Sequence, residues 1–273
     1  MRKNVFRRAT AALLGAAVIS MAAPAVTATA TTPPATRATW LLSGQKLMPG
    51  QSMISGASEL VMQTDGNLVL YLDGDTGHRG PVLWASGTYN NPGAYAYMQP
   101  DGNFVVYRQG GGPATGGALW NSGSWGHEGV GVELLNGSLA VSGPSTYWWS
   151  HTGPGAATDT LDASHSDMPS GSWIESNSVW LVMQLDGNLV LYRKRDGAVL
   201  WASGSYDPEA NAHLSGYTTS SALTVISLRT QRTWYLPVAG RPGDYAKVQD
   251  DGNFVLYSSD GTARWSTGTW GNW

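Results

Sequence analysis

A nine-residue pattern occurs four times in this chain without a gap, and no other feature limits the possible folds so strongly. The pattern is Q-x-D-G-N-L/F-V-x-Y, and its copies begin at Gln63, Gln99, Gln184 and Gln249. Each copy is followed by a Trp segment of the form W-x-S/T-G, at Trp84, Trp120, Trp201 and Trp265. Repetition of this kind predicts one small supersecondary unit that is used several times.

Two further segments keep the apolar positions of the pattern and a following Trp, but have lost its polar positions. In residues 133–142 the polar positions hold Leu134, Asn136, Ser138 and Ser142. In residues 218–226 they hold Thr218, Ser220, Ala222 and Ile226. Because the chain tolerates this loss in one repeat of three, we expect the polar residues of the intact copies to serve a function other than folding.

The six copies form two groups of three, which predicts two related domains. Neighbouring copies are about 35 residues apart within a group and about 50 apart between the groups. The extra length is the segment 153–159, whose Gly, Pro, Ala and Thr residues are typical of a linker. Leu47–Ser55 is echoed by Asp167–Ser176 at the same place in each group. We therefore predict domains at 39–152 and 160–273, preceded by a short linker at 31–38.

Residues 1–30 have the features of a secretory signal peptide. Four of the first eight residues are basic, and an apolar stretch, Ala11–Ala23, follows them. This stretch is too short to span a bilayer comfortably. Small residues follow, and we expect cleavage near Ala28 to Ala30. The mature protein is therefore predicted to be secreted and extracellular.

Composition argues against several classes of protein. Only 13% of the residues are charged, which disfavours coiled coils, and the absence of Cys rules out disulfides and thiolate metal sites. Residues 1–30 hold four basic and no acidic residues, so the mature chain has twelve Lys and Arg against nineteen Asp and Glu, a net charge of about −7. This charge disfavours nucleic acids and anionic membranes. We expect no nucleic-acid partner and no membrane insertion.

The pattern predicts a β-hairpin, because Asp-Gly lies between two runs of alternating residues. In the first copy we expect strands at Leu60–Gln63 and Asn67–Tyr71, with a third strand at Val82–Ser86. Leu68 and Leu70 would face the core, and the residues that alternate with them would face outward. No helical period extends over twelve residues of the mature chain.

The fold class that follows is all-β. The economical arrangement is three small antiparallel sheets per domain, related by pseudo-three-fold symmetry. The Trp residues that follow the copies would meet where the three sheets face one another, as part of the core.

The outward polar face suits a neutral ligand that is rich in hydroxyl groups. Gln and Asn offer donors and an acceptor, ionised Asp only accepts, and Tyr does both, with a small apolar Val among them. A sugar presents hydroxyls of both characters around C–H patches. A phosphate would require cations or bare N–H groups, and a Ca²⁺ loop would require more carboxylates than the one in each copy. We expect no metal and no cofactor.

These residues resemble the mannose-binding motif Q-x-D-x-N-x-V-x-Y of the bulb-type lectins, the monocot mannose-binding lectins whose fold is the β-prism II. The likeness extends from about Thr39 to Trp273. It implies two tandem β-prism II domains with a carbohydrate-binding site at each intact copy. In that family the Asp and Asn are taken to bond O2 of mannose, the Gln O3 and the Tyr O4, while the Val packs on the ring carbons.

The resemblance implies four sites in this chain. Site one comprises Gln63, Asp65, Asn67, Val69 and Tyr71; site two Gln99, Asp101, Asn103, Val105 and Tyr107; site three Gln184, Asp186, Asn188, Val190 and Tyr192; and site four Gln249, Asp251, Asn253, Val255 and Tyr257. The two degenerate copies depart from the motif, so we predict that they do not bind. Plant members usually carry a disulfide in each domain, whereas this chain must rely on packing.

The predicted function is that of a secreted, multivalent and non-catalytic lectin that binds mannose-containing glycans or cell-surface polysaccharide, and a homodimer is left open. The alternative is a lectin-like bacteriocin, which kills related bacteria after it binds their surface polysaccharide, since tandem bulb-lectin domains also resemble that class. A glycosidase is less favoured, because nothing in the spacing of Glu128 and Glu133 pairs them with the motif Asp residues.

Overall fold

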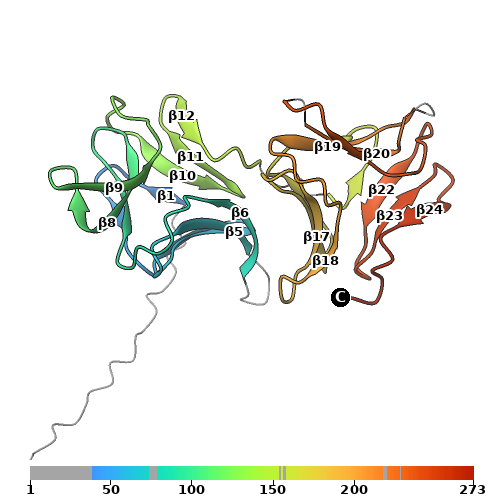
Figure 1. Cartoon of the computed structure of the whole chain (residues 1–273), viewed down its shortest axis with the longest axis horizontal. Coiled ribbons are helices and arrows are strands. Elements are labelled where there is room, and N and C mark those ends of the chain that lie inside the picture. The colour runs from blue at the N-terminus through green and yellow to red at the C-terminus, as the bar shows by residue number, and fades with distance from the viewer. Residues whose placement is uncertain (1–38, 74–78, 154, 156–157, 218–219, 228) are drawn as a thin grey trace, which may run out of the picture. The chain divides into compact units, whose positions relative to one another are not determined.

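The computed structural model describes residues 39–73, 79–153, 155, 158–217, 220–227 and 229–273. These residues form six four-stranded antiparallel sheets, and this part of the chain contains no helix (Figure 1). The all-β prediction is confirmed. The predicted signal peptide at 1–30 and the linker at 31–38 lie outside the described residues.

The first three sheets each contain one intact or degenerate copy of the pattern. The sheet of the first copy comprises β3 (Ser52–Ser55), β4 (Ser58–Met62), β5 (Leu68–Asp73) and β6 (Arg79–Ala85). The next comprises β2 (Lys46–Leu47), β7 (Tyr95–Met98), β8 (Phe104–Gly112) and β9 (Gly116–Asn121). The third comprises β1 (Trp40–Leu41), β10 (Gly131–Leu135), β11 (Ser138–Ser142) and β12 (Thr146–Trp149).

The remaining three sheets repeat this plan. The first comprises β15 (Trp173–Glu175), β16 (Val179–Met183), β17 (Leu189–Arg193) and β18 (Val199–Ala202). The next comprises β14 (Asp167–Met168), β19 (Ala210–Leu214), β20 (Leu223–Ser227) and β21 (Thr233–Tyr235). The last comprises β13 (Thr160–Leu161), β22 (Tyr245–Val248), β23 (Phe254–Tyr257) and β24 (Ala263–Ser266). Two groups of three such sheets are the tandem β-prism II architecture that was predicted.

The fourth strand of every sheet comes from the leading residues of its group, which the sequence did not predict. β3, β2 and β1 join the sheets of the first, second and third copies in turn, so about fifteen residues supply three sheets. β15, β14 and β13 do the same in the second group. The echo of Leu47–Ser55 in Asp167–Ser176 is the trace of this arrangement. The exact domain limits at 39–152 and 160–273 stay a prediction.

Each intact copy folds into a hairpin with a three-residue loop. In the first copy Met62 pairs with Leu68, and the amide of Gln63 then donates to the carbonyl of Asn67 at 2.8 Å. Gly66 closes this loop with a φ of 94°, which favours glycine. The three predicted strands are therefore present as β4, β5 and β6, with end points that differ from the prediction by up to three residues.

The side of each sheet that was predicted to be apolar forms the core. Leu68 and Leu70 of β5 are fully buried. In the first group, Trp84, Trp120 and Trp148 form a triangle with ring centroids 5.2 to 5.6 Å apart and interplanar angles of 70° to 73°. Each edge-to-face pair contributes about 0.5–1.5 kcal/mol beyond its buried area. The prediction that the Trp residues meet at the centre is confirmed.

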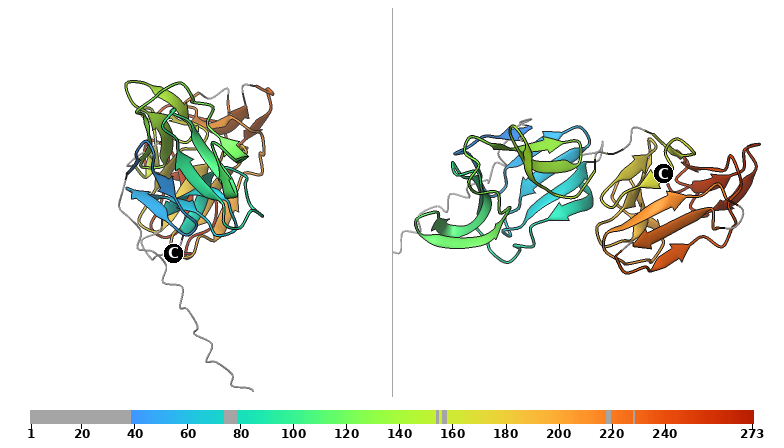
Figure 2. Two further views of the ribbon diagram at one scale, coloured as in Figure 1. Left: turned by 90° about the vertical axis from the view of Figure 1, so that its left-hand side faces the viewer. Right: turned by 90° about the horizontal axis from the view of Figure 1, so that it is seen from above.

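The second group builds a similar but looser centre. The Trp201 ring lies 5.9 Å from Trp234 and 5.8 Å from Trp265, both at steep angles. Phe254 packs edge to face on Trp265 at 6.2 Å. Figure 2 shows the sheets of each group standing around a common centre. Packing of this kind takes the place of a disulfide in a chain without Cys.

The structure corrects the alignment of the first degenerate copy. Leu134 pairs with Leu139 and is fully buried, so it cannot occupy the place of the motif Gln. Leu135, which pairs with Ser138, holds that place. A two-residue Asn-Gly turn with φ values of 35° and 91° replaces the three-residue loop. The shorter turn leaves no position for the motif Asp.

The second degenerate copy is also shifted from its predicted alignment. Leu214 pairs with Leu223, and the amide of Ser215 donates to the carbonyl of Ala222 at 2.8 Å. This is the bond that Gln63 makes in the first copy, so Ser215 holds the place of the Gln that was assigned to Thr218. The loop between them is longer than in the intact copies.

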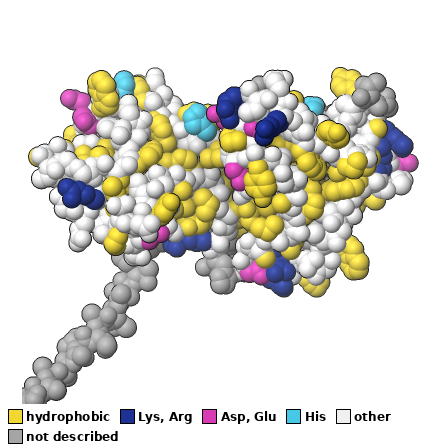
Figure 3. Space-filling view, in the orientation of Figure 1, with side chains coloured by type: hydrophobic (Ala, Val, Ile, Leu, Met, Phe, Trp, Pro, Cys, Tyr) yellow, Lys and Arg dark blue, Asp and Glu magenta, His cyan; other side chains and the backbone are white. Residues whose placement is uncertain are grey.

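Charged side chains are sparse on the face that Figure 3 shows, in keeping with the low charge content of the chain. No helix in the described part of the chain has the length and apolarity that a membrane span requires.

The adjacent residues Trp148 and Trp149 allow a test of the central triangle. They point to opposite faces of β12, and Trp149 is 44% exposed. We expect Trp148→Ala to lower the free energy of unfolding by about 3 kcal/mol, because it removes a half-buried ring that two other rings pack against. Trp149→Ala should cost about 1 kcal/mol or less. Urea denaturation measures both, and equal losses would contradict the central role of the triangle.

Candidate functional site

The Gln and Tyr of an intact copy are hydrogen-bonded to each other on the outward face of their sheet. In site one Gln63 Nε2 donates to Tyr71 Oη at 2.7 Å. The same bond is 2.6 Å long in site three and 2.8 Å long in site four. Residues eight positions apart thus form one continuous surface across the hairpin, as the sequence pattern predicts.

The Asp of each copy is held by its own loop. Its Oδ1 accepts a hydrogen bond from the backbone amide of the Asn two residues later, at 2.9 Å in site one and 3.0 Å in the other three sites. This turn-stabilising bond fixes the carboxylate beside the Asn. The second oxygen, Oδ2, has no hydrogen-bond partner among the described residues and is left for a ligand.

The Asn side chain is held from the Trp segment. In site one, Asn67 Oδ1 accepts from Ser86 Oγ at 3.1 Å and from the amide of Thr88 at 3.0 Å. The two hydroxyls contact each other at 2.7 Å, and Thr88 Oγ1 donates to the carbonyl of Gly66 at 2.7 Å. Because Oδ1 is used in this way, Asn67 presents its Nδ2 donor to a ligand.

The same hydroxyl pair, two and four residues after the Trp, occurs in the other intact copies. Its members are Ser122 and Ser124 in site two, Ser203 and Ser205 in site three, and Thr267 and Thr269 in site four. The degenerate third repeat keeps the pair as Ser150 and Thr152, although Ser138 stands where the motif has its Asn. The pair therefore stabilises the fold in every one of these repeats, and in the intact copies it also orients the Asn. Its signal in the sequence was the repeated spacing of hydroxyl residues after the Trp.

In sites one, three and four, these internal bonds leave the same hydrogen-bonding groups without a partner. The acceptors are Asp Oδ2 and Gln Oε1, and the donors are Asn Nδ2 and the Tyr hydroxyl. The central Val is at most 3% exposed in each of the three. The faces can therefore exchange hydrogen bonds with a neutral ligand at several points, and they offer only a narrow apolar strip.

The Tyr hydroxyls are donors over a wide pH range. Burial raises the pKa of Tyr71 above its ordinary value of 10, although Arg79 and Gln63 act to lower it. Burial also raises the pKa of Tyr192. Since a raised pKa keeps a phenol protonated, both groups can donate to a ligand at any pH below about 10.

The Gln and Tyr of site two are more covered than those of the other sites, whereas the motif Asn is more buried in sites three and four. Gln99 is 7% exposed and Tyr107 is 5% exposed, whereas the corresponding residues elsewhere are half-buried. Tyr107 Oη donates to Gln99 Oε1 at 3.4 Å, which reverses the direction of the bond. Tyr95 lies 5.9 Å from Tyr107 between ring centroids and donates to the carbonyl of Gly111 at 2.8 Å. This hydrogen bond from β7 to β8 holds the long hairpin of β8 and β9 beside the site.

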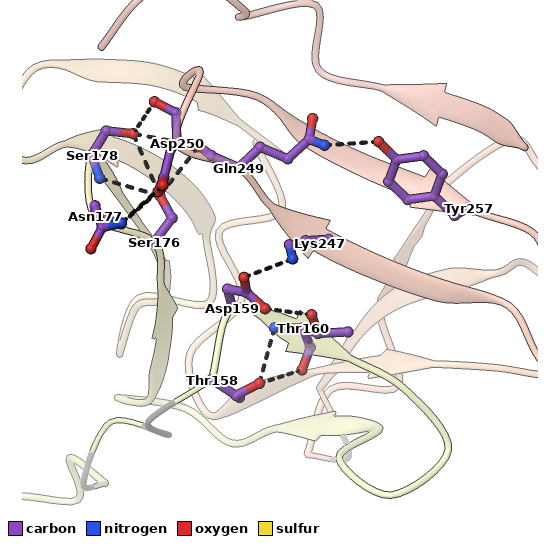
Figure 4. A network of polar contacts seen from close by, with 10 residues as sticks. All are labelled: Thr158, Asp159, Thr160, Ser176, Asn177, Ser178, Lys247, Gln249, Asp250 and Tyr257. Carbon is purple, nitrogen blue, oxygen red and sulfur yellow. Dashed lines mark hydrogen bonds and ion pairs between the residues drawn. The ribbon is translucent and has the colours of Figure 1, made fainter. Parts of the chain in front are cut away.

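Site four lies beside a polar cavity of about 880 Å³, and Figure 4 shows its Gln–Tyr bond next to the polar network of that cavity. Lys247 pairs with Asp159 at 2.9 Å, and Lys194 pairs with Glu175 at 2.6 Å. Burial acts to raise the pKa of Asp159, but hydrogen bonds from Thr160 and Lys247 lower it below its ordinary value. Both lysines of the lining are thus paired with carboxylates.

The described residues include no group of three or more His, Cys, Asp or Glu side chains that could hold a metal ion. Glu133, one of the two acids considered for catalysis, lies in β10, a strand of a degenerate copy. It accepts a hydrogen bond from Ser142 Oγ at 3.2 Å.

The loop that follows each Trp segment lies against the Asp-Gly turn of its own copy. In site one, the amide of Asn91 donates to the carbonyl of Asp65 at 2.9 Å. A Cβ added at Gly66 would collide with the carbonyl oxygen of Asn91. The motif Gly thus permits both the left-handed turn and a close approach of two backbones.

No protein-family model matches the chain, and no curated protein matches it. Several solved structures of lectins are similar to it. A monomeric monocot mannose-binding lectin from Gastrodia elata is 30% identical, with a TM-score of 0.36, over 42% of this chain and 96% of that chain. The mannose-specific agglutinin of snowdrop, Galanthus nivalis, is 30% identical, with a TM-score of 0.33, over 40% of this chain and 92% of that chain. The two-domain fetuin-binding agglutinin of Scilla campanulata is 23% identical, with a TM-score of 0.31, over 84% of this chain and 96% of that chain.

Two glycines of the first repeat form a matched pair for testing the turn. Gly66 and Gly87 both have positive φ, at 94° and 71°, but a Cβ at Gly87 would meet nothing within 4 Å. Each change to Ala should cost about 1 kcal/mol for the backbone conformation. We expect Gly66→Ala to cost about 1–3 kcal/mol more, because the loop at Asn91 must move. Chemical denaturation measures the difference, and equal costs would show that the close approach does not constrain the site.

Proposed function

We propose that this chain belongs to the bulb-type mannose-binding lectin family and acts as a multivalent, non-catalytic carbohydrate-binding protein. The observation that carries this proposal is an array of the same side chains on four separate sheets, which the same internal hydrogen bonds hold in sites one, three and four. Each of these three arrays leaves two acceptors and two donors without a partner among the described residues. Folding alone does not require this arrangement, because two repeats of six fold without it.

The chemistry of the array favours a sugar. Vicinal hydroxyls can each donate to one side chain and accept from another, which matches Asp Oδ2 beside Asn Nδ2 and Gln Oε1 beside the Tyr hydroxyl. The single carboxylate at each site is neutralised by no cation of the motif, so a neutral ligand avoids the repulsion that an anion would meet. Mannose-type sugars are the ligand that the family resemblance implies for these residues.

The sites act together because each of them is weak. A few hydrogen bonds that replace bonds to water should give a single sugar about millimolar affinity, near −4 kcal/mol. Several sites on one molecule can raise the apparent affinity for a polyvalent glycan by about 10²- to 10⁴-fold. The ligand that we propose for the multivalent protein is therefore a mannan or a high-mannose glycan and not free mannose.

The proposal includes secretion through a signal peptide at residues 1–30. The bacteriocin alternative uses the same sites and differs only in the outcome, since binding to a surface polysaccharide would then be followed by death of the target cell. A growth-inhibition assay on neighbouring bacterial strains separates the two outcomes.

Removal of the four motif carboxylates tests the proposed function. We expect the combined change of Asp65, Asp101, Asp186 and Asp251 to Ala to abolish binding to immobilised mannan, measured by surface plasmon resonance. A second variant with Asn at the four positions keeps the Oδ1 acceptor of the turn and replaces only Oδ2, so it separates ligand binding from loop stability.

A charge-matched control changes four surface Asp residues outside the motif: Asp162, Asp167, Asp196 and Asp260. This control should bind mannan as the wild type does. The proposal is wrong if both motif variants fold, as judged by circular dichroism, and still bind mannan with undiminished affinity.

The closed geometry of site two predicts that the four sites contribute unequally. We compare a variant that keeps only Asp251 with one that keeps only Asp101, the other three motif Asp residues being Asn in each. The variant with site four should bind mannan at least about tenfold more tightly, because Gln99 and Tyr107 are covered in site two. Equal affinity would show that the hairpin of β8 and β9 does not restrict access.

A further inference from the structure

An exposed aromatic residue stands at the same position in all four intact repeats, five residues after the Trp. These residues are Tyr89, Trp125, Tyr206 and Trp270, and they are 59%, 70%, 64% and 70% exposed. Large rings exposed to this extent forgo the stabilisation that burial would give them. The regular placement therefore requires an explanation other than packing.

The two degenerate repeats lack the aromatic. Five residues after Trp148 the chain has Gly153, and five residues after Trp234 it has Ala239. Both repeats still form their sheets and supply a ring to the Trp centre. The exposed aromatic thus occurs where the polar motif is intact and is missing where the motif is lost, so it accompanies the site and not the fold.

Hydrogen bonds from the backbone on both sides hold Tyr89 next to site one. Before Tyr89, the amide of Thr88 donates to Asn67 Oδ1 at 3.0 Å. After Tyr89, the amide of Asn91 donates to the carbonyl of Asp65 at 2.9 Å. The residues on either side of Tyr89 are therefore hydrogen-bonded to the Asn and the Asp of site one, which keeps the ring next to that site.

Sites two and four show a similar attachment after the aromatic residue. The amide of Gly126 donates to the carbonyl of Asp101, and the amide of Gly271 donates to the carbonyl of Asp251, both at 2.8 Å. In site three, Tyr206 is close enough to act electrostatically on the hydroxyl of Tyr192 and to help raise its pKa. The aromatic residue and the polar array are thus parts of one surface.

We propose that these four aromatic residues form a second subsite beside each mannose site, which stacks on the C–H face of the neighbouring sugar unit in a glycan chain. This inference rests on the proposed function. A polar array binds the first unit by hydrogen bonds, and an exposed ring next to it offers the flat apolar surface that the array lacks, since the central Val is buried. The ligand class is then a linked mannose oligosaccharide, for which the ring adds affinity that a single sugar does not gain.

The test compares a monosaccharide with an oligosaccharide on the full chain. The variant carries Ala at Tyr89, Trp125, Tyr206 and Trp270, and the ligands are methyl α-mannoside and a linear α-linked mannotriose. We expect the affinity for methyl α-mannoside to stay within about twofold of the wild type, whereas the affinity for mannotriose falls about tenfold, to nearly that of the monosaccharide.

The matched control changes exposed Tyr residues of a degenerate repeat, Tyr217→Ala and Tyr235→Ala, which are 74% and 63% exposed. This control should keep the wild-type preference for mannotriose. A conservative variant, Trp125→Phe with Trp270→Phe, retains two flat rings and should recover most of the preference. In the wild type, mannotriose should also protect exposed indoles from iodide quenching more than methyl α-mannoside does.

The outcomes separate this inference from the proposed function. If the wild type binds neither ligand and the motif Asp variants change nothing, the proposed function fails. If the motif Asp variants lose binding but the four-aromatic variant keeps the full preference for mannotriose, the second subsite is wrong and the lectin function stands. If the four-aromatic variant loses affinity for both ligands equally, the rings belong to the primary site and the subsite is again wrong. A change in sedimentation of the variant without a change in sugar preference would assign the rings to self-association instead.

Discussion

The structure depends on three indole rings that pack edge to face where three sheets meet. Each ring of the first triangle comes from a different repeat, so no sheet can complete its core without the other two. Aromatic rings supply large buried areas with a defined mutual geometry, which suits a chain that has no disulfide. The inward face of every sheet packs against this centre, and the polar side chains of the motif therefore lie on the outward face.

The polar side chains of the outward face use some of their atoms for structure and leave the others for the proposed sugar binding. One oxygen of Asp65 closes the turn and the other has no partner among the described residues, while Asn67 Oδ1 accepts a hydrogen bond from the Trp segment and its amide nitrogen is left as a donor. This division explains why the motif keeps Asp and Asn two residues apart. The degenerate third repeat retains the hydroxyl pair without the Asn, which shows that the scaffold precedes the site.

The hairpins, the two faces of each strand and the Trp centre could be predicted from the sequence, because alternation and repetition report them directly. The fourth strand of each sheet could not, because strands as short as Trp40–Leu41 are too brief to show a period. The register of the degenerate copies was misjudged for a related reason, since their loops differ in length from those of the intact copies. The closure of site two depends on one bond from Tyr95 to Gly111 between distant parts of a hairpin, and no local pattern announces it.

The short leading strands have a consequence for how the chain folds. β1 begins the described residues, yet Trp40 pairs with Glu133, so the third sheet of the first group waits for residues about ninety positions later. Contacts between such distant positions raise the entropic cost of closure and slow folding. The leading segment of the first group joins all three of its sheets, so the stability of each sheet is tied to that of the other two.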